Sequence, residues 1–423
     1  MERDNIKKMI KNAVPNIKPK KDFDSEISIF SFIKLMPEDV YHDADENNII
    51  TNTPPVKKKK KFNKQVLSWL FILLNIVIVA VIFINQSAEG GIRPISELFA
   101  EGPYYRFLFL GLGLMIVALL IESLKFSCII KTTTGKFRPW LSTKVAVIGR
   151  YWDCITPFGS GGQPFQIYFM SKNGYSADNA TGIPLMKHMF WQIAFCVIAV
   201  IVILIPIEIA NVGNVVRYLA WFGILGNVLL FGFMLFMSIN KRVGSKILNG
   251  ILKLLHKMKI IKNLEKATVK SMETFDNYQK CIKKSLKNPL AFLLQIFLAV
   301  LNIVVYASIA YCIYLAFNYG AYLDGTLQLT SWIQIVTLSV LCDAAVSLIP
   351  LPGGSGAAEL SFIGLFGLMF KPDMQFWAML FWRTFTYYGI ILVGLVFVVM
   401  ESIKNSKMRK LHNLANVTVV KEE

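Results

Sequence analysis

The chain has 423 residues, of which 54% are hydrophobic and only 17% are charged. Soluble globular domains carry about 25% charged residues, so this composition argues against a cytosolic enzyme. The formal net charge of +18 indicates basic loops beside anionic lipid, and nucleic acid is not an expected partner. The six cysteines form no CxxC pair, so we interpret them as small buried apolar residues and expect neither disulfides nor a metal site.

The first 64 residues are polar and hold 14 Lys/Arg and 10 Asp/Glu. They end in Pro54-Pro55 and in a run of lysines from Lys57 to Lys61. We interpret residues 1–64 as a disordered cytoplasmic tail with a polybasic stop beside the membrane. The tail serves either as a topology anchor or as a regulatory segment that contacts lipid headgroups.

Six apolar segments follow, and each is long enough to cross a bilayer core of about 30 Å at 1.5 Å per residue. They are residues 66–84, 107–124, 191–209, 215–237, 289–317 and 376–400. Two further apolar stretches, 145–170 and 333–370, are interrupted by glycine and proline. The sequence therefore predicts an all-α polytopic integral membrane protein, with a transmembrane domain over residues 65–400 and a cytoplasmic tail over 401–423.

The charges of the connecting segments orient these spans. Residues 241–288 hold 13 Lys/Arg against 3 acidic residues, which predicts a cytoplasmic position. The 125–144 segment and the tail after Met400 are also basic, whereas the 86–105 segment carries three glutamates against Arg93 and is expected outside. Both termini then lie in the cytoplasm only if each interrupted stretch returns to its own side. We therefore expect two re-entrant helical hairpins, the first from the cytoplasm and the second from the exterior.

An apolar stripe at helical spacing lies within residues 241–288 and is surrounded by lysines. The stripe contains Ile247, Leu248, Ile251, Leu252, Leu255 and Met258, and the lysines are Lys246, Lys253, Lys257 and Lys259. This pattern predicts a basic amphipathic helix that lies in the headgroup plane. A helix that binds a partner protein is the alternative.

The motif Pro-x-Gly-Ser-Gly, followed by a small residue, occurs twice, at Pro157 and at Pro352, 195 residues apart. Each copy lies inside an interrupted stretch, with two spans before it and one span after it. The first unit, about 66–209, starts inside, and the second, about 215–400, starts outside. The sequence thus predicts an inverted repeat of two spans, a re-entrant hairpin and one span, which is typical of transporters with a site between the interrupted segments.

Interrupted helices persist in a membrane only where they are buried or line a cavity, because lipid cannot satisfy free backbone groups. Glycine lets a ligand approach the backbone, and the half-helix after each turn begins with free N–H groups that attract phosphate. Glu359 stands at the second helix start, where it either caps the helix or alternates with an incoming phosphate. The alternative is that both turns are packing corners. The candidate substrate-binding residues of the turns are Pro157, Gly159, Ser160, Gly161, Gln163, Pro352, Gly354, Ser355, Gly356 and Glu359.

Ionisable side chains inside apolar segments are costly and are therefore candidate site residues. Arg150 either pairs with Asp153 on one helix face or contacts the substrate. Lys187, near the predicted start of the third span, either snorkels to the interface or contacts phosphate.

Two more ionisable residues belong to the second half. Asp343 lies in an apolar helix nine residues before Pro352, and it either pairs with a basic group or carries a proton. Arg383 lies inside the last span, one turn before Tyr387, and we expect it to bind phosphate or carboxylate. The sequence contains no Walker-type loop, HExxH or GxSxG motif, so we expect no catalytic residues, no cofactor and no use of ATP.

The two motif regions are TPFGSGGQPFQIYFM (156–170) and LIPLPGGSGAAELSF (348–362). They resemble the signature regions of the lysylphosphatidylglycerol synthase transmembrane-domain family, also called flippase-like. The resemblance covers roughly residues 65–400, and Arg383 with the following Tyr and Gly fits the last helix of that family. The first motif has Gln163-Pro164 where many members carry Gly-Glu.

The resemblance implies a bacterial inner-membrane protein that handles lipids. In the multiple peptide resistance factor, such a domain is thought to flip aminoacylated phosphatidylglycerol outward. There it precedes a soluble acyltransferase domain that takes lysine from lysyl-tRNA. Only a short tail follows Met400, so we expect no synthase domain in this chain. Membrane phospholipid is the expected partner, and a separate lipid synthase and a second copy of the chain are further candidates.

Three functions stay open on the sequence. The favoured one is a flippase or transporter for anionic or aminoacylated phospholipid of the lysyl-phosphatidylglycerol class, with Arg150 and Arg383 neutralising the phosphate between the turns. The second is a phosphatidylglycerol lysyltransferase that acts alone or with a partner synthase. The third is a scaffold for envelope enzymes that transports nothing.

Overall fold

The computed structural model describes residues 104–204, 214–239, 241–258, 263–347, 349 and 351–420, with short pieces between 77 and 97. The chain divides into two units, Met1–Trp69 and Leu70–Glu423, and all described residues belong to the second. The predicted tail over 1–64 and most of the predicted span over 66–84 lie outside the described residues. Every regular element of the described residues is a helix, which confirms the predicted all-α class.

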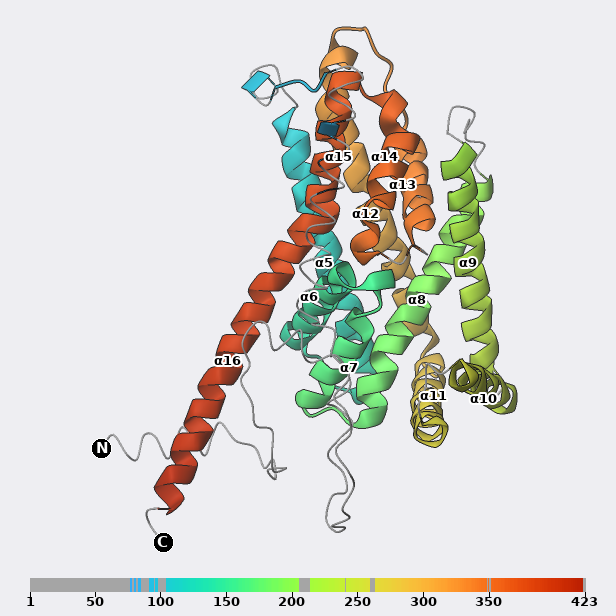
Figure 1. The fold of residues 1–423 in the computed structure, drawn as a ribbon, viewed down its shortest axis with the longest axis vertical. Coiled ribbons are helices and arrows are strands. Elements are labelled where there is room, and N and C mark those ends of the chain that lie inside the picture. Colours follow the sequence, from blue (N-terminus) through green and yellow to red (C-terminus); the bar gives the residue numbers. More distant parts are fainter. Residues whose placement is uncertain are drawn as a thin grey trace, which may run out of the picture. The chain divides into compact units, whose positions relative to one another are not determined.

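Helices, short 3-10 turns and a π-helical segment make up the described part of the chain (Figure 1). The long helices are α5 (Tyr105–Thr134), α6 (Pro139–Ile155), α7 (Gly162–Lys172), α8 (Ala177–Leu204), α9 (Asn214–Ile239), α10 (Lys241–Lys257), α11 (Leu264–Leu286), α12 (Pro289–Leu323), α13 (Trp332–Val346), α14 (Ala357–Phe366), α15 (Gln375–Arg383) and α16 (Gly389–Val420). The 3-10 turns η2 (Pro157–Gly159) and η4 (Pro352–Gly354) separate α6 from α7 and α13 from α14. A π-helical segment, η7 (Thr384–Tyr388), joins α15 to α16.

Local sequence signals start two of the helices near the site. The Asn288 side chain accepts a hydrogen bond from the backbone N–H of Ala291 at the start of α12, where a proline follows the cap. At the start of α13, the Ser331 hydroxyl accepts from the Gln334 N–H, and the Gln334 side chain accepts from the Ser331 N–H. This reciprocal pair is a capping box, which satisfies two amides that the helix itself leaves free.

Four helical segments are long and apolar enough to cross a membrane. They are Tyr105–Thr134, Ala177–Val202, Pro289–Leu323 and Pro372–Lys404, and the last runs through α15, η7 and α16. They correspond to four of the six predicted spans, while α9, at the predicted span over 215–237, contains a shorter apolar stretch, Trp221–Phe233. Phe109 and Leu290 are 71% and 77% exposed. Such exposed apolar side chains are expected where helices face lipid.

All four segments extend beyond the predicted bounds, and α5 and α8 do so by the largest amounts. α5 continues to Thr134, past the predicted end at Leu124, and α8 begins at Ala177, before the predicted span over 191–209. Lys187 therefore lies within α8 and not at its start, so that part of the prediction was wrong. Charged side chains lower the local hydropathy, but here they face other helices, as the fully buried Lys125 does.

The two interrupted helix pairs approach each other through their turns. α6 and α7 lie toward one end of the described bundle, and α13 and α14 lie toward the other end (Figure 1). The turn η2 contacts the turn η4, and α6 also contacts η4. The fold therefore brings together the two motif copies at Pro157 and Pro352.

A glycine lets α9 cross α13 closely, because a Cβ on Gly223 would overlap the carbonyl oxygen of Ala344. We expect Gly223→Ala to lower the free energy of unfolding by about 1–3 kcal/mol, since the two backbones must separate. Gly232→Ala in the same helix is the control, because nothing lies within 4 Å of that position. It should raise stability by about 0.5–1 kcal/mol through helix propensity. Equal effects on unfolding of the detergent-purified protein would contradict this packing.

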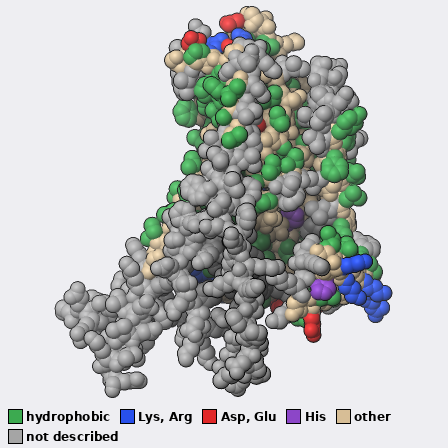
Figure 2. Space-filling model, in the orientation of Figure 1, with side chains coloured by type: hydrophobic (Ala, Val, Ile, Leu, Met, Phe, Trp, Pro, Cys, Tyr) green, Lys and Arg blue, Asp and Glu red, His purple; other side chains and the backbone are tan. Residues whose placement is uncertain are grey.

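The helix α10 presents a basic and partly apolar surface. Figure 2 shows Lys and Arg side chains gathered at the end of the bundle where α10 and α11 lie. The exposed basic residues of α10 are Arg242, Lys246, Lys253 and Lys257. Leu254 and Met258 are 57% and 60% exposed, whereas Leu252 is 5% exposed and packs inward. This arrangement has the amphipathic character expected within 241–288, and its position in the headgroup plane stays a prediction.

The helix α11 packs against α8. A Cβ on Gly182 of α8 would overlap the sulfur of Cys281. Burial raises the pKa of the Cys281 thiol to about 11, so the thiol stays protonated and packs as a small apolar group. All six cysteines are free, and four of them are buried.

Candidate functional site

The backbone conformation of the second turn, which comprises η4 and the residues up to the start of α14, requires glycine. Gly353, Gly354 and Gly356 have φ angles of 59°, 61° and 85°, in the left-handed region that other residues adopt only at a cost. A Cβ on Gly353 would also overlap the aromatic ring of Tyr387. Both backbone conformation and close packing therefore require glycine at position 353.

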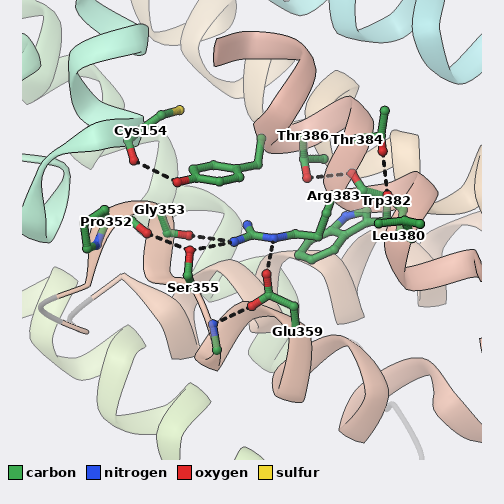
Figure 3. A network of polar contacts seen from close by, with 12 residues as sticks. Cys154, Pro352, Gly353, Ser355, Glu359, Leu380, Trp382, Arg383, Thr384 and Thr386 are labelled. Atoms are coloured by element: carbon green, nitrogen blue, oxygen red, sulfur yellow. Dashed lines mark hydrogen bonds and ion pairs between the residues drawn. The ribbon is translucent and has the colours of Figure 1, made fainter. Parts of the chain in front are cut away.

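A buried ion pair holds this turn in place. Arg383 Nε donates a hydrogen bond of 2.7 Å to Glu359 Oε1, and their side chains are only 5% and 1% exposed. Arg383 Nη2 also donates to the Gly353 carbonyl oxygen at 3.3 Å and to Ser355 Oγ at 3.5 Å. Figure 3 shows the Arg383 side chain pointing toward all three of these residues. A single guanidinium thus connects the last span to the backbone of η4 and to the first turn of α14.

Glu359 uses its second carboxylate oxygen to cap α14. Glu359 Oε2 accepts a hydrogen bond of 2.6 Å from the backbone N–H of Gly356. A carboxylate in the first turn of a helix is favoured by the helix dipole. The structure therefore assigns Glu359 to capping, one of the two roles considered for it, and gives Arg383 a protein carboxylate as its partner.

A π-helical segment places an aromatic ring against this pair. The Arg383 guanidinium carbon lies 4.4 Å from the ring centre of Tyr387, which is within cation–π range. The Tyr387 hydroxyl donates to the backbone carbonyl of Cys154 at 3.3 Å. The Tyr306 hydroxyl donates to the Thr386 carbonyl at 2.6 Å. Single π-helical turns often mark functional sites, and this one links α6 and α12 to the second turn.

The first turn is held by side chains of the helix before it. Thr156 Oγ1 accepts a hydrogen bond of 2.8 Å from the Gly161 N–H. Asp153 Oδ1 accepts one of 2.9 Å from the Gly162 N–H at the start of α7. We expected the amides at both half-helix starts to be free, and for these residues and for Gly356 that expectation was wrong. Short polar side chains at the turns satisfy them locally.

A second cluster of buried charges joins α5 to α8. Glu122 accepts hydrogen bonds from Lys125 at 2.7 Å and from Lys187 at 2.5 Å. The Lys125 side chain is 0% exposed and the Lys187 side chain is 14% exposed. One carboxylate therefore binds two ammonium groups, and Lys187 lies in an ion pair instead of at the interface.

We expect Glu122→Ala to lower the free energy of unfolding by about 3–5 kcal/mol, because it leaves two lysines in the interior without a carboxylate. Lys125→Met should cost much less, since Glu122 keeps Lys187 and methionine fills a similar volume. Chemical unfolding in mixed micelles measures both effects. A loss from Lys125→Met as large as that from Glu122→Ala would contradict the assigned roles.

Arg150 and Asp343 differ from these paired charges. The Arg150 guanidinium lies 5.7 Å from the ring centre of Tyr306 and forms no ion pair within the described residues. It does not pair with Asp153, which caps α7 instead. Asp343 is exposed, although Cys342 and Ala344 beside it are 0% exposed. Its carboxylate likewise forms no hydrogen bond or ion pair with the part of the chain that the structure describes.

The other candidate residues lie around the first turn or within the second. Gly159 and Ser160 are exposed, and the Ser160 hydroxyl donates to the Pro157 carbonyl at 2.8 Å. Gln163 is half-buried on α7. The buried members of the second turn are Pro352, Gly354 and Ser355. The candidates thus gather at the contact between η2 and η4, except Lys187, whose partner is Glu122.

Sequence reasoning missed the roles of Tyr306, Glu122 and Lys125. Polar residues inside the long apolar helices α5 and α12 were the available signal, but the pattern does not say which helix each one faces. The described residues include no group of three His, Cys, Asp or Glu side chains placed to hold a metal ion.

Long apolar helices with exposed apolar side chains, and buried charges beside two interrupted helix pairs, indicate a helical integral membrane protein. Comparison with protein families matches residues 71–394 to the lysylphosphatidylglycerol synthase TM region. Because this match covers most of the chain, the protein belongs to that family, which confirms the resemblance predicted from the two motifs. Comparison with curated proteins gave no match.

Proposed function

We propose that this protein moves an anionic or aminoacylated phospholipid, of the lysyl-phosphatidylglycerol class, between the leaflets of a membrane. The observation that carries the proposal is the contact between η2 and η4. Asp153 lies at the first turn, Glu359 and Arg383 lie at the second, and Arg150 and Asp343 lie nearby. A lipid headgroup needs a polar path, and buried charges in membrane segments mark such paths. The acyl chains would stay in the bilayer beside the exposed apolar faces of the long helices.

The lengths of the half-helices support re-entrant hairpins. α7 has 11 residues and α14 has 10, so at 1.5 Å per residue they extend about 15–17 Å, half the thickness of a bilayer core. A hairpin of this size places its turn near mid-membrane. Both turns would then meet there from opposite sides, as an inverted repeat requires.

The orientation follows from the basic helix. The exposed basic residues of α10 favour the cytoplasmic side, so α7 would return to the cytoplasm and α14 to the exterior. We extend the proposal to a bacterial inner membrane with both termini cytoplasmic.

The family description names a synthase, which supports a second candidate, lysyl transfer to phosphatidylglycerol alone or with a separate synthase. One experiment tests both functions. The purified protein is reconstituted into vesicles that contain phosphatidylglycerol with a fluorescent headgroup, and a reductant that cannot cross the membrane quenches the outer leaflet.

We expect the inner-leaflet label to become accessible in vesicles with protein and to stay protected in protein-free vesicles. The same protection in both would contradict the transport proposal. In a parallel sample with lysyl-tRNA, formation of lysyl-phosphatidylglycerol by the purified protein alone would instead support the transferase.

A further inference from the structure

Two opposite charges from different helices lie near each other without forming an ion pair within the described residues. Arg150 on α6 and Asp343 on α13 interact electrostatically, and Tyr306 and Arg383 also lie near enough to Asp343 to interact with it. Groups from three other helices therefore lie within electrostatic range of Asp343, and its side chain is exposed. Because the Asp343 side chain is exposed, a ligand can reach its carboxylate.

The neighbouring charges are already engaged. Arg383 is bound by Glu359, Lys187 is bound by Glu122, and Asp153 accepts from the first amide of α7. These groups hold the scaffold, and a ligand that took Arg383 away would leave the buried Glu359 carboxylate uncompensated. Arg150 and Asp343 can bind a ligand without breaking an ion pair.

The ring of Tyr306 limits where a ligand can reach Arg150. The ring covers the guanidinium at 5.7 Å, and the Tyr306 hydroxyl is fixed by its hydrogen bond to Thr386. The forked donors of arginine suit a phosphate, and the cation–π contact holds the side chain when no phosphate is present. The carboxylate of Asp343 attracts a cation and repels an anion.

We infer that Arg150 and Asp343 together bind a headgroup that carries both charges, with the phosphodiester at Arg150 and a primary ammonium at Asp343. The inference rests on the proposed function, because it takes a phospholipid as the ligand. Lysyl-phosphatidylglycerol and phosphatidylethanolamine share this chemistry. Phosphatidylglycerol has no ammonium, so it lacks a partner for Asp343 and binds less tightly.

The test measures binding of short-chain lipids to the full-length protein in mild detergent, by their shift of the unfolding temperature and by native mass spectrometry. The probes are dioctanoyl lysyl-phosphatidylglycerol, phosphatidylethanolamine and phosphatidylglycerol. Asp343→Asn removes the charge with little change of shape, and Arg150→Gln removes the phosphate partner. Asp324→Asn, an exposed position after α12, is the matched control.

We expect Asp343→Asn to weaken binding of both ammonium lipids about tenfold, or about 1.4 kcal/mol, and not to weaken binding of phosphatidylglycerol, because the carboxylate that it removes repels an anion. Arg150→Gln should weaken all three lipids, and Asp324→Asn should weaken none. Tighter binding of one of the two ammonium lipids to the unmodified protein identifies which of the two lipids supplies the headgroup. If Asp343→Asn proves unstable, Asp343→Glu keeps the charge and should retain the selectivity.

If Asp343→Asn weakened the binding of all three lipids by the same factor, or weakened the binding of none, the inference would be overturned. The binding assay does not depend on transport. If the protein moves no lipid but its selectivity for ammonium lipids depends on Asp343, the transport function alone is refuted. Transport with unaltered selectivity in the variant would refute the headgroup assignment alone.

Discussion

Replacement of Arg383 by alanine is expected to lower the free energy of unfolding by about 3–5 kcal/mol, because Glu359 would stay buried without its partner. The Glu359 side chain is only 1% exposed. Unfolding in mixed micelles measures the loss. The double variant Arg383→Leu/Glu359→Leu should lose less free energy of unfolding than the single variants Arg383→Leu and Glu359→Leu lose together, since it removes both charges at once.

A partly exposed ion pair provides the comparison for this effect. Arg93 Nε lies 2.9 Å from Asp373 Oδ2, with side chains 22% and 30% exposed. Arg93→Ala should cost no more than about 1 kcal/mol through that pair. Additive losses from Arg383 and Glu359, or equal losses at Arg383 and Arg93, would show that the buried pair does not hold the second turn.

The second large effect is expected at Gly353. A Cβ there costs about 1–2 kcal/mol for the left-handed backbone, and it also forces the Tyr387 ring away. Gly353→Ala should therefore lower the free energy of unfolding by about 3 kcal/mol or more. It should also break the hydrogen bond from the Tyr387 hydroxyl to the Cys154 carbonyl. The rate of lipid movement should also fall, because this hydrogen bond connects η7, beside the second turn, to α6, which leads into the first turn.

The matched control is Gly325→Ala. Gly325 has a φ of 71° with nothing within 4 Å of its Cβ position, so this variant carries only the backbone cost. Equal stabilities of the two variants would mean that the ring of Tyr387 moves freely and that the contact at Gly353 is unimportant.

The sequence was sufficient to predict the helical class, the two glycine turns and the family. These predictions depend on local properties: hydrophobic length, the dihedral freedom of glycine, and a motif repeated at Pro157 and Pro352. The contact between η2 and η4 agrees with the expectation that the interrupted segments meet. The inverted, re-entrant arrangement stays a proposal.

The sequence did not predict which charged side chains pair with one another. Arg383 was expected to bind phosphate or carboxylate, and its partner is the carboxylate of Glu359, 24 residues away in the chain. Lys187 binds Glu122 from another helix. Each charge in an apolar segment has several helices to face, and hydropathy does not distinguish a protein partner from a ligand. The same ambiguity shortened the predicted spans, because charges that are paired inside the bundle resemble charges at a membrane surface.

The central claim is that the meeting of the two turns provides a path for a lipid headgroup. The most direct measurement follows the amine of lysyl-phosphatidylglycerol, loaded into the inner leaflet of proteoliposomes, with an amine reagent that cannot cross the membrane. We predict rapid labelling with the unmodified protein and with Gly325→Ala, and labelling at least about tenfold slower with Gly353→Ala at equal protein content. Labelling at the rate of protein-free vesicles for the unmodified protein, or at one rate for all three proteins, would contradict the account.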